Sequence, residues 1–326
     1  MNKLKQKILA EVEEDLSEIE TALRENLNPH FDLVRETASH ILFSGGKRLR
    51  PLLMVLCGRL CGYSGDYDKI FSVVFEYLHA ATLLHDDLVD GASLRRGKPT
   101  AHSVWDNSTA VLVGDFLLAR SLSIGTETGN LKIIRIISEI TENMSQGEIR
   151  QLMRKGNLKL SEAEYMDIIR CKNAVLIQGA CRVGALIADA GEEEESALSA
   201  YGFNLGIAFQ MADDLLDYTS DSGTLGKNVG ADLKEGKLTL PVISSLEAAD
   251  PIDRDEMEEI IKNKDFSLRD FERLVEMLEI YGGIRYTKHQ ATRYVEQAKE
   301  AISIFKNSKT KQILLNIADF ALSRKH

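Results

Sequence analysis

Apolar residues recur at spacings of three and four along nearly the whole chain, which is the period of an amphipathic α-helix. One such stripe runs through Leu4, Ile8, Val12 and Leu16. The chain has five prolines, and none interrupts a long periodic segment. No extended stretch alternates apolar and polar residues in the way that a half-buried strand does. The pattern therefore predicts an all-α protein.

The periodic segments predict about ten helices or more. We expect them at residues 2–25, 29–43, 50–62, 68–90, 101–106, 108–126, 131–154, 161–190, 195–219 and 239–248, with several more towards the C-terminus. No linker rich in Gly, Ser or Pro divides the 326 residues, which favours a single domain over residues 1–326. The glutamates at 192–195 follow Gly191 and are expected to begin a helix, where acids suit the helix dipole.

The composition limits the class of partner. Hydrophobic residues make up 44% of the chain and charged residues 28%, as in a soluble globular protein. A net charge of −10 argues against nucleic acid as a ligand, because a phosphate backbone needs a basic face. An anionic substrate would therefore need a local cluster of cations or metal ions.

The cysteines and the N-terminus bear on the compartment. Cys57 and Cys61 lack a second pair at zinc-ligand spacing, and with Cys171 and Cys181 they are expected to be free thiols in a reducing compartment. The amphipathic, acidic N-terminus resembles neither a signal peptide nor a transit peptide. No apolar run approaches the roughly 20 residues that span a bilayer. We therefore expect a cytoplasmic protein without a transmembrane segment.

Two clusters of aspartates end apolar helical segments. The pattern Asp-Asp-x-x-Asp occurs in LLHDDLVDG and again in FQMADDLLD. In each, the first and last acids, Asp86 with Asp90 and Asp213 with Asp217, lie four residues apart and share a helix face, which destabilises a helix that carries no counter-charge. Mg²⁺ reverses this effect, since it is held by one or two carboxylates together with substrate phosphates. A solvated helix end could explain one cluster, but two clusters predict a clamp for metal and diphosphate across a helical cavity.

Basic loops accompany both clusters. The segment GGKRLRP at 45–51 has glycines that permit close backbone approach, and Lys47, Arg48 and Arg50 offer donors for phosphate oxygens. Further cations follow the two acidic clusters, namely Arg95 and Arg96 after the first and Lys227 and Lys237 after the second. Each loop alone would be read as a solvated surface, whereas all four elements together predict a site for diphosphates.

Four segments resemble, in order and spacing, the signature motifs of the trans-isoprenyl (polyprenyl) diphosphate synthases, especially the long-chain members. They are GGKRLRP, LLHDDLVDGASLRRG, FQMADDLLD and GKNVGADLKEGKLTLP. The resemblance implies one large helical bundle around a deep central cavity, and a homodimer. It also implies that Mg²⁺, three ions with substrate bound, helps to ionise an allylic diphosphate such as farnesyl diphosphate. The resulting cation is attacked by isopentenyl diphosphate, and a proton is lost.

The resemblance also implies roles for individual residues. The metal ligands would be Asp86, Asp90 and Asp213, supported by Asp87 and Asp217. Isopentenyl diphosphate would contact Lys47, Arg50, His79 and Arg96, and the allylic diphosphate would contact Arg95, Lys172, Gln210, Lys227 and Lys237. The catalytic candidates are Asp86, Asp213, Lys172 and Gln210. Asn173 stands where the family usually has threonine and keeps a carbonyl acceptor, so activity should be retained. His79 on its own would be read as a core histidine, and His85 is expected to be structural.

Small residues one helical turn before Asp86 bear on the product. The family's short-chain members tend to place aromatic side chains there, whereas this chain has Ala81 and Thr82. An open pocket implies a long product, hexaprenyl to decaprenyl, and each isoprene unit needs about three helical residues of depth. The floor candidates, which could equally be ordinary core residues, are Ile133, Ile134 and Ile137.

Four other functions are possible for a helical chain with these motifs. A short-chain farnesyl or geranylgeranyl diphosphate synthase would differ only in the pocket. A helical metal phosphohydrolase would leave GGKRLRP and the second acidic cluster without a role. A terpene cyclase seldom needs the second diphosphate site that Lys47 and Arg50 imply. A non-catalytic partner subunit commonly lacks the acidic ligands that are present here.

Overall fold

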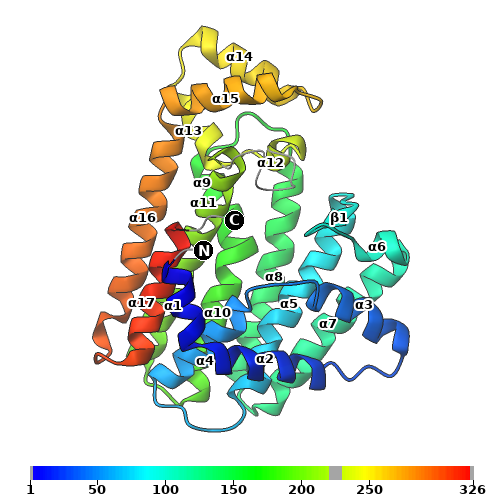
Figure 1. The fold of residues 1–326 in the computed structure, drawn as a ribbon, viewed down its shortest axis with the longest axis vertical. Helices are drawn as coiled ribbons and strands as arrows, with labels where there is room; N and C mark the ends of the chain where they lie inside the picture. The colour runs from blue at the N-terminus through cyan, green and yellow to red at the C-terminus, as the bar shows by residue number, and fades with distance from the viewer. Residues whose placement is uncertain (1–2, 220–229, 324–326) are drawn as a thin grey trace.

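The computed structural model of the chain describes residues 3–219 and 230–323, most of them helical (Figure 1). The first half forms α1 (Lys3–Glu11), α2 (Glu13–Glu25), α3 (Asp32–Leu42), α4 (Leu49–Leu60), α5 (Asp68–Val89), α6 (Ala101–Val104), α7 (Asn107–Glu127) and α8 (Leu131–Arg154). The second half forms α9 (Glu162–Ile169), the π-helical turn η1 (Arg170–Ala174), α10 (Val175–Ile187), α11 (Glu192–Thr219), α12 (Ala231–Lys234), α13 (Leu240–Ala248), α14 (Pro251–Lys262), α15 (Leu268–Ile280), α16 (Gly283–Ala301), the 3-10 turn η2 (Ile302–Ile304) and α17 (Lys309–Leu322). The all-α prediction is confirmed.

Two predicted helices are interrupted. The segment expected at 2–25 breaks between α1 and α2 at Val12, whose backbone leaves the helical region (φ −124°, ψ 13°) while its side chain is buried. The segment expected at 161–190 is divided into α9, η1 and α10 by the π-helical turn. The glutamate run does begin α11 as predicted, and Glu194 accepts a hydrogen bond from the backbone of Gly191.

A small hairpin was not predicted. The two-residue strands β1 (Leu94–Arg95) and β2 (Lys98–Pro99) pair antiparallel directly after α5. Both turn residues, Arg96 (φ 52°) and Gly97 (φ 75°), lie in the left-handed region, as a tight hairpin turn requires. Strands this short leave no alternating pattern in a sequence. The hairpin fixes the backbone that carries Arg95 and Arg96.

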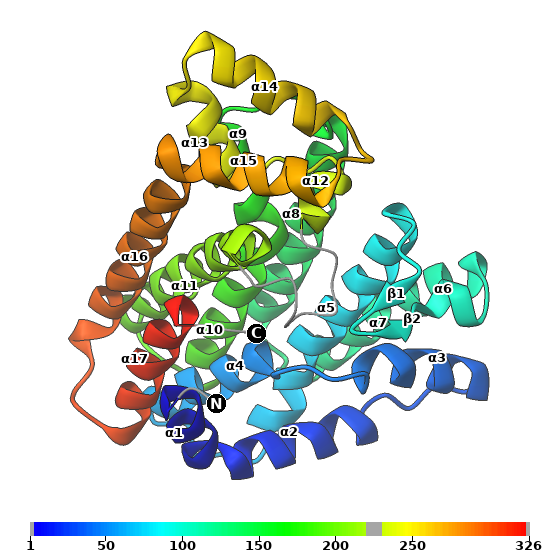
Figure 2. The same ribbon diagram turned by 45° about the horizontal axis from the view of Figure 1, so that its top comes forward.

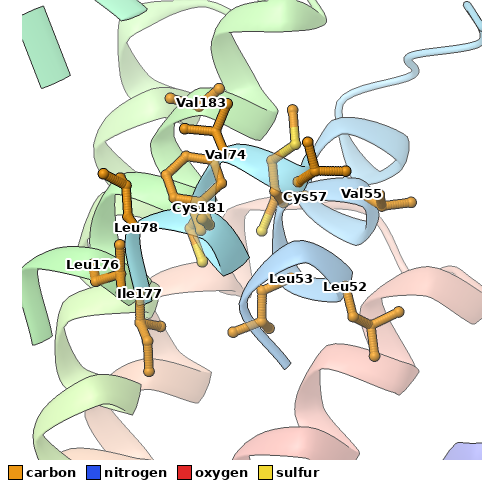
Figure 3. Packing of buried hydrophobic residues seen from close by; sticks show 14 of the residues in the cluster. Leu52, Leu53, Val55, Cys57, Val74, Leu78, Leu176, Ile177, Cys181 and Val183 are labelled. Atoms are coloured by element: carbon orange, nitrogen blue, oxygen red, sulfur yellow. The ribbon is translucent and has the colours of Figure 1, made fainter. Parts of the chain in front are cut away.

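The larger apolar cluster is centred on α4, α5 and α10 (Figure 3). α4 and α10 pack closely because Gly184 has no side chain: a Cβ there would lie 2.4 Å from the carbonyl oxygen of Met54. Cys57 and Cys181 face this cluster. All four cysteines are free, and only Cys61 is not fully buried. Burial raises the pKa of the Cys57 thiol well above its usual value, so this thiol stays protonated.

A second apolar cluster lies beneath α14 and α15, which cross one end of the molecule (Figure 2). α11 belongs to both clusters: Leu198, Tyr201 and Leu205 pack in the first, and Met211 and Tyr218 pack in the second. The part of α11 that carries FQMADDLLD therefore lies where the two clusters meet.

α7 is long and apolar enough, by length and composition, to cross a membrane. No such segment was predicted from the sequence. Ala110, Val113, Leu117 and Ile124 on one face are buried in the core next to α5, while Leu112 is exposed. A core helix of a folded domain has this arrangement.

Candidate active site

One cavity of about 260 Å³ brings the acidic motifs together. Its lining includes Asp86 from α5, Asp90 directly after α5, Asp214 from α11, and Asp232 from α12. Cations surround these acids, and the cavity wall also includes Arg95, Arg154, Lys155, Lys172 and Lys237. The two aspartate motifs thus contribute to one concave site, as a clamp requires.

The two acids of the first motif that line the cavity differ in environment. Burial raises the pKa of Asp86 to about 6, although Lys172 nearby acts in the opposite direction. Asp90 has a lysine on each carboxylate oxygen, with Lys237 Nζ at 2.8 Å and Lys155 Nζ at 3.4 Å. Burial alone would raise the pKa of Asp90, but the hydrogen bond from Lys237 and the charges of the lysines lower it. Asp90 is therefore ionised at neutral pH.

Asp87, which was predicted to support the metal ligands, does not line this cavity. Its side chain is buried, and both carboxylate oxygens accept hydrogen bonds from Arg95 Nε, at 2.8 and 2.9 Å. Because Arg95 lines the cavity, Asp87 holds in place a cation that faces the site. Adjacent helical residues point about 100° apart, which is why Asp87 turns away from the face of Asp86.

The second motif presents a different acid from those predicted. Asp213 is exposed, and Asp217 accepts hydrogen bonds from the backbone of Ala231 (3.1 Å) and Asp232 (3.2 Å), which makes it a cap for α12. Neither lines the cavity, whereas Asp214 does. The face of α11 that meets the cavity therefore carries Gln210 and Asp214, four residues apart.

A chain of hydrogen bonds joins Asp214 to the position where threonine was expected. Asp214 accepts from Tyr165 Oη and from Gln210 Nε2, both at 2.6 Å. Gln210 Oε1 in turn accepts from Asn173 Nδ2. Asn173 thus uses its amide nitrogen within the protein, and its carbonyl oxygen is the acceptor left for the cavity that it lines. The role of Asn173 as a carbonyl acceptor for the substrate stays a prediction.

Two buried acids here have raised pKa values. Burial raises the pKa of Asp232 to about 7, and Asp217 nearby adds to the effect. Burial likewise raises the pKa of Asp214 well above its usual value, with a further contribution from Asp232. A cation in the cavity would favour the ionised forms of both acids.

Lys172 is presented by η1. Its ammonium group pairs with Glu148 of α8, a residue to which the sequence analysis gave no role. The π-helical turn fits against α8 because residue 147 is glycine: a Cβ there would lie 2.7 Å from Cys171 Cβ. Single π-helical turns of this kind occur frequently at functional sites.

A basic cluster lies near the glycine loop, two helical turns before Asp86. Burial lowers the pKa of His79 well below its usual value, and Arg50 and Arg96 lower it further. His79 is therefore neutral and can donate one N–H. Arg96 donates to the carbonyl oxygen of Gly45 and joins the hairpin to the GGKRLRP loop. Lys47 lies apart from this cluster, 5.7 Å from the ring centre of Phe320.

Arg48 is not available as the phosphate donor that was predicted. It is 5% exposed and donates to Glu20 (2.5 Å), Glu76 (2.8 Å) and the carbonyl oxygen of Leu42 (2.7 Å). Its left-handed backbone (φ 48°) turns the side chain inward. Through these buried hydrogen bonds, Arg48 holds the GGKRLRP loop in place. Lys227, which was predicted to contact the allylic diphosphate, lies outside the described residues.

None of the residues predicted to set chain length is among the lining residues of the cavity. Leu83 lines it, whereas Thr82 is half-buried and donates to the carbonyl oxygen of His79. Ala81 and Ile137 are fully packed in the larger apolar cluster. Of the other floor candidates, Ile133 is buried and Ile134 is half-buried. His85, as expected, packs away from the cavity, with Nε2 3.2 Å from the carbonyl oxygen of Val111 in α7.

Within residues 3–219 and 230–323, no group of three or more His, Cys, Asp or Glu side chains could hold a metal ion alone. The donors fit a hard cation that shares its coordination with a ligand, because Asp86 and Asp90 supply carboxylate oxygens beside cations that can bind phosphate. Metal and diphosphate would therefore bind together.

Comparison with known proteins identifies the family of the chain. The model of the polyprenyl synthetase family matches residues 31–278. The octaprenyl diphosphate synthase of Escherichia coli (strain K12) is 35% identical over 95% of this chain and 96% of its own. An all-trans-nonaprenyl-diphosphate synthase (geranyl-diphosphate specific) of Rhodobacter capsulatus is 36% identical over 98% of both chains. A crystal structure of the polyprenyl synthase from Caulobacter crescentus CB15, complexed with calcium and isoprenyl diphosphate, has a TM-score of 0.92 at 38% identity and 98% coverage of both chains.

The chain belongs to the polyprenyl synthetase family. It is a prenyltransferase with the all-helical fold of that family, as the sequence motifs predicted.

Proposed function

We propose that this enzyme condenses isopentenyl diphosphate with an allylic diphosphate, such as farnesyl diphosphate, and releases a long-chain all-trans polyprenyl diphosphate. The observation that carries the proposal is the shared cavity in which Asp86 and Asp90 face Asp214 and Asp232 among several cations. The relatives named for octaprenyl and nonaprenyl products support the long chain.

In the first step, the allylic C–O bond breaks and both of its electrons leave with the diphosphate. Arg95, Lys172 and Lys237 line the cavity and would stabilise the charge that develops on the leaving group. Mg²⁺, three ions in the proposal, would supply further charge stabilisation, and Asp86, Asp90 and the acids of the second motif would hold it. The ordered acceptor on Asn173 would face the allylic cation.

In the second step, the double bond of isopentenyl diphosphate attacks the allylic cation and forms a C–C bond. The basic cluster of Arg50, His79 and Arg96 would bind the diphosphate of this second substrate, and Lys47 of the same GGKRLRP loop would contribute a further cation. The proton lost from the condensation product would pass to the released diphosphate, so no protein base is needed.

The direct test is to incubate the purified chain with isopentenyl diphosphate, farnesyl diphosphate and MgCl₂, and to measure product length by chromatography. Products of hexaprenyl to decaprenyl length would support the proposal, and farnesyl or geranylgeranyl products would indicate a short-chain synthase. Phosphate release from nucleotides without prenyl transfer would indicate a phosphohydrolase. Inactivity of the chain alone, restored by a second protein, would indicate one component of a two-part enzyme.

We expect Thr82→Phe to shorten the product by several isoprene units, because the ring would meet the tail about one helical turn, roughly 5 Å, below Asp86. Thr82 is half-buried and accommodates a ring better than the fully packed Ala81, where Ala81→Phe would also shorten the product but risks overpacking. Thr292→Phe, the same exchange on an exposed position of α16, is the control. An unchanged product distribution for Thr82→Phe would contradict the proposed path of the tail.

The proposal includes a cytoplasmic homodimer. Leu112 and Leu122 are exposed on α7, and a second copy of the chain could cover them. Light scattering of the purified protein would give the number of subunits.

A further inference from the structure

Lys155 reaches the cavity from the C-terminal end of α8, and the sequence motifs give it no role. It is the residue at which α8 ends, and it lines the same cavity as Asp86 and Asp90. Its ammonium group lies 3.4 Å from Asp90 Oδ1. Of its side chain, 33% remains exposed.

A backbone contact holds Lys155 beside Lys237. The N–H of Gly156 donates to the carbonyl oxygen of Gly236 at 2.8 Å. Both glycines have left-handed backbones (φ 74° and 75°), and a Cβ on Gly236 would lie 3.2 Å from Lys155 Cγ. Two segments about 80 residues apart in the chain thus place two lysines on one carboxylate.

This arrangement conflicts with metal binding unless one lysine moves. Both oxygens of Asp90 are occupied by ammonium groups, and a divalent cation would repel both of them. Lys237 has a second partner, Glu235, at 2.6 Å and is 19% exposed. In the described part of the chain, Asp90 is the sole ion-pair partner recorded for Lys155. Lys155 is therefore the lysine that loses its partner.

The neighbouring cations of α8 are already committed. Arg154 also lines the cavity, but it pairs with Glu164, and Arg150 pairs with Asp167 at 2.9 Å. Once a cation binds Asp90, the new negative charge beside Lys155 would be that of a diphosphate. An ammonium group makes charge-assisted hydrogen bonds to such oxygens.

We propose that Lys155 exchanges partners during the catalytic cycle: it holds Asp90 while no metal is bound, and it binds the allylic diphosphate when a divalent cation takes Asp90. The inference rests on the proposed function and adds a substrate contact that also competes with the metal. It predicts that Lys155→Ala strengthens the binding of Mg²⁺ and weakens the binding of the diphosphate.

The test follows thermal unfolding of the full chain in two titrations, one with MgCl₂ alone and one with inorganic pyrophosphate at saturating MgCl₂. For Lys155→Ala, we expect the MgCl₂ midpoint to fall about two- to fivefold, because Mg²⁺ no longer competes with Lys155 for Asp90. The ion pair that is lost is worth about as much as an exposed ion pair. We expect the pyrophosphate midpoint to rise about tenfold, because a charge-assisted hydrogen bond is lost. The same variant should raise KM for the allylic diphosphate and leave KM for isopentenyl diphosphate nearly unchanged.

Lys159→Ala, an exposed lysine four residues further along the same loop, is the matched control and should change neither midpoint. Lys155→Arg should restore most of the pyrophosphate affinity. An unchanged pyrophosphate midpoint in Lys155→Ala would overturn the inference, and so would a rise in both midpoints, which is what distortion of the site would cause. If pyrophosphate failed to stabilise the unaltered chain as well, the proposed function itself would be wrong.

Discussion

Asp86→Asn is expected to lower kcat for prenyl transfer by about 10²- to 10³-fold, the effect of removing one group that stabilises transition-state charge. Asp86 lies on the cavity wall, and its carboxylate is one of the two from the first motif that would hold a metal ion against the diphosphate. The measurement is the rate of incorporation of labelled isopentenyl diphosphate at saturating MgCl₂. Asp66→Asn, the same exchange in the exposed loop before α5, should leave the rate unchanged.

The metal-free stability of this variant separates a lost ligand from a damaged fold. Burial raises the pKa of Asp86 to about 6, so the folded protein binds this proton more tightly than the unfolded chain does. For such a group, stability falls as the pH rises from about 4 through 6, and above pH 6 the ionised form is a net cost. Asp86→Asn should therefore be at least as stable as the unaltered protein at pH 7.5 without metal. A variant that is both inactive and unstable would contradict the assignment.

Arg48→Met is expected to lower the free energy of unfolding by about 3–5 kcal/mol, because it removes one partner of a buried ion pair. The carboxylate of Glu76, with 9% of its side chain exposed, would remain buried without its cation. Denaturant unfolding followed by circular dichroism would measure the change.

Arg35→Met is the matched control for this second experiment. Arg35 pairs with Asp32 at 3.0 Å, but 87% of the Asp32 side chain is exposed, so the loss should stay below about 1 kcal/mol. Equal losses in the two variants would show that Arg48 does not support the loop from a buried position. The Arg48→Met protein should also bind isopentenyl diphosphate less well, because GGKRLRP would lose its support.

The sequence allowed the fold class, the helices and the meeting of the two acidic motifs to be predicted, because all three depend on local periodicity and on motif chemistry. It did not allow the choice between neighbouring acids. In the second Asp-Asp-x-x-Asp motif, Asp213 and Asp217 lie four residues apart, and both were expected to face the cavity. In the structure, Asp214 and Gln210 line the cavity, whereas Asp213 and Asp217 are not among its lining residues. Which face of α11 meets the cavity depends on contacts with α10 and α16, which lie elsewhere in the chain.

Residues brought in from other segments were missed for a similar reason. Glu148 and Lys155 carry no local signal that distinguishes them from solvated charges. Only the tertiary fold brings Lys155 to the cavity wall and pairs Glu148 with Lys172. Arg48 was misassigned because a basic residue in a glycine loop usually faces solvent, whereas its left-handed backbone turns it inward. The break at Val12 and the turn at Arg96 likewise depend on the backbone conformation of single residues, which hydrophobic periodicity does not predict.

The position of α11 between two apolar clusters affects how the enzyme loses activity when it begins to unfold. Heat or denaturant that loosens only the layer under α14 and α15 would release one wall of the reaction chamber while the other cluster stayed intact. Prenyl transfer should then be lost before most of the helical signal, and inactivation would be an early, sensitive gauge of partial unfolding.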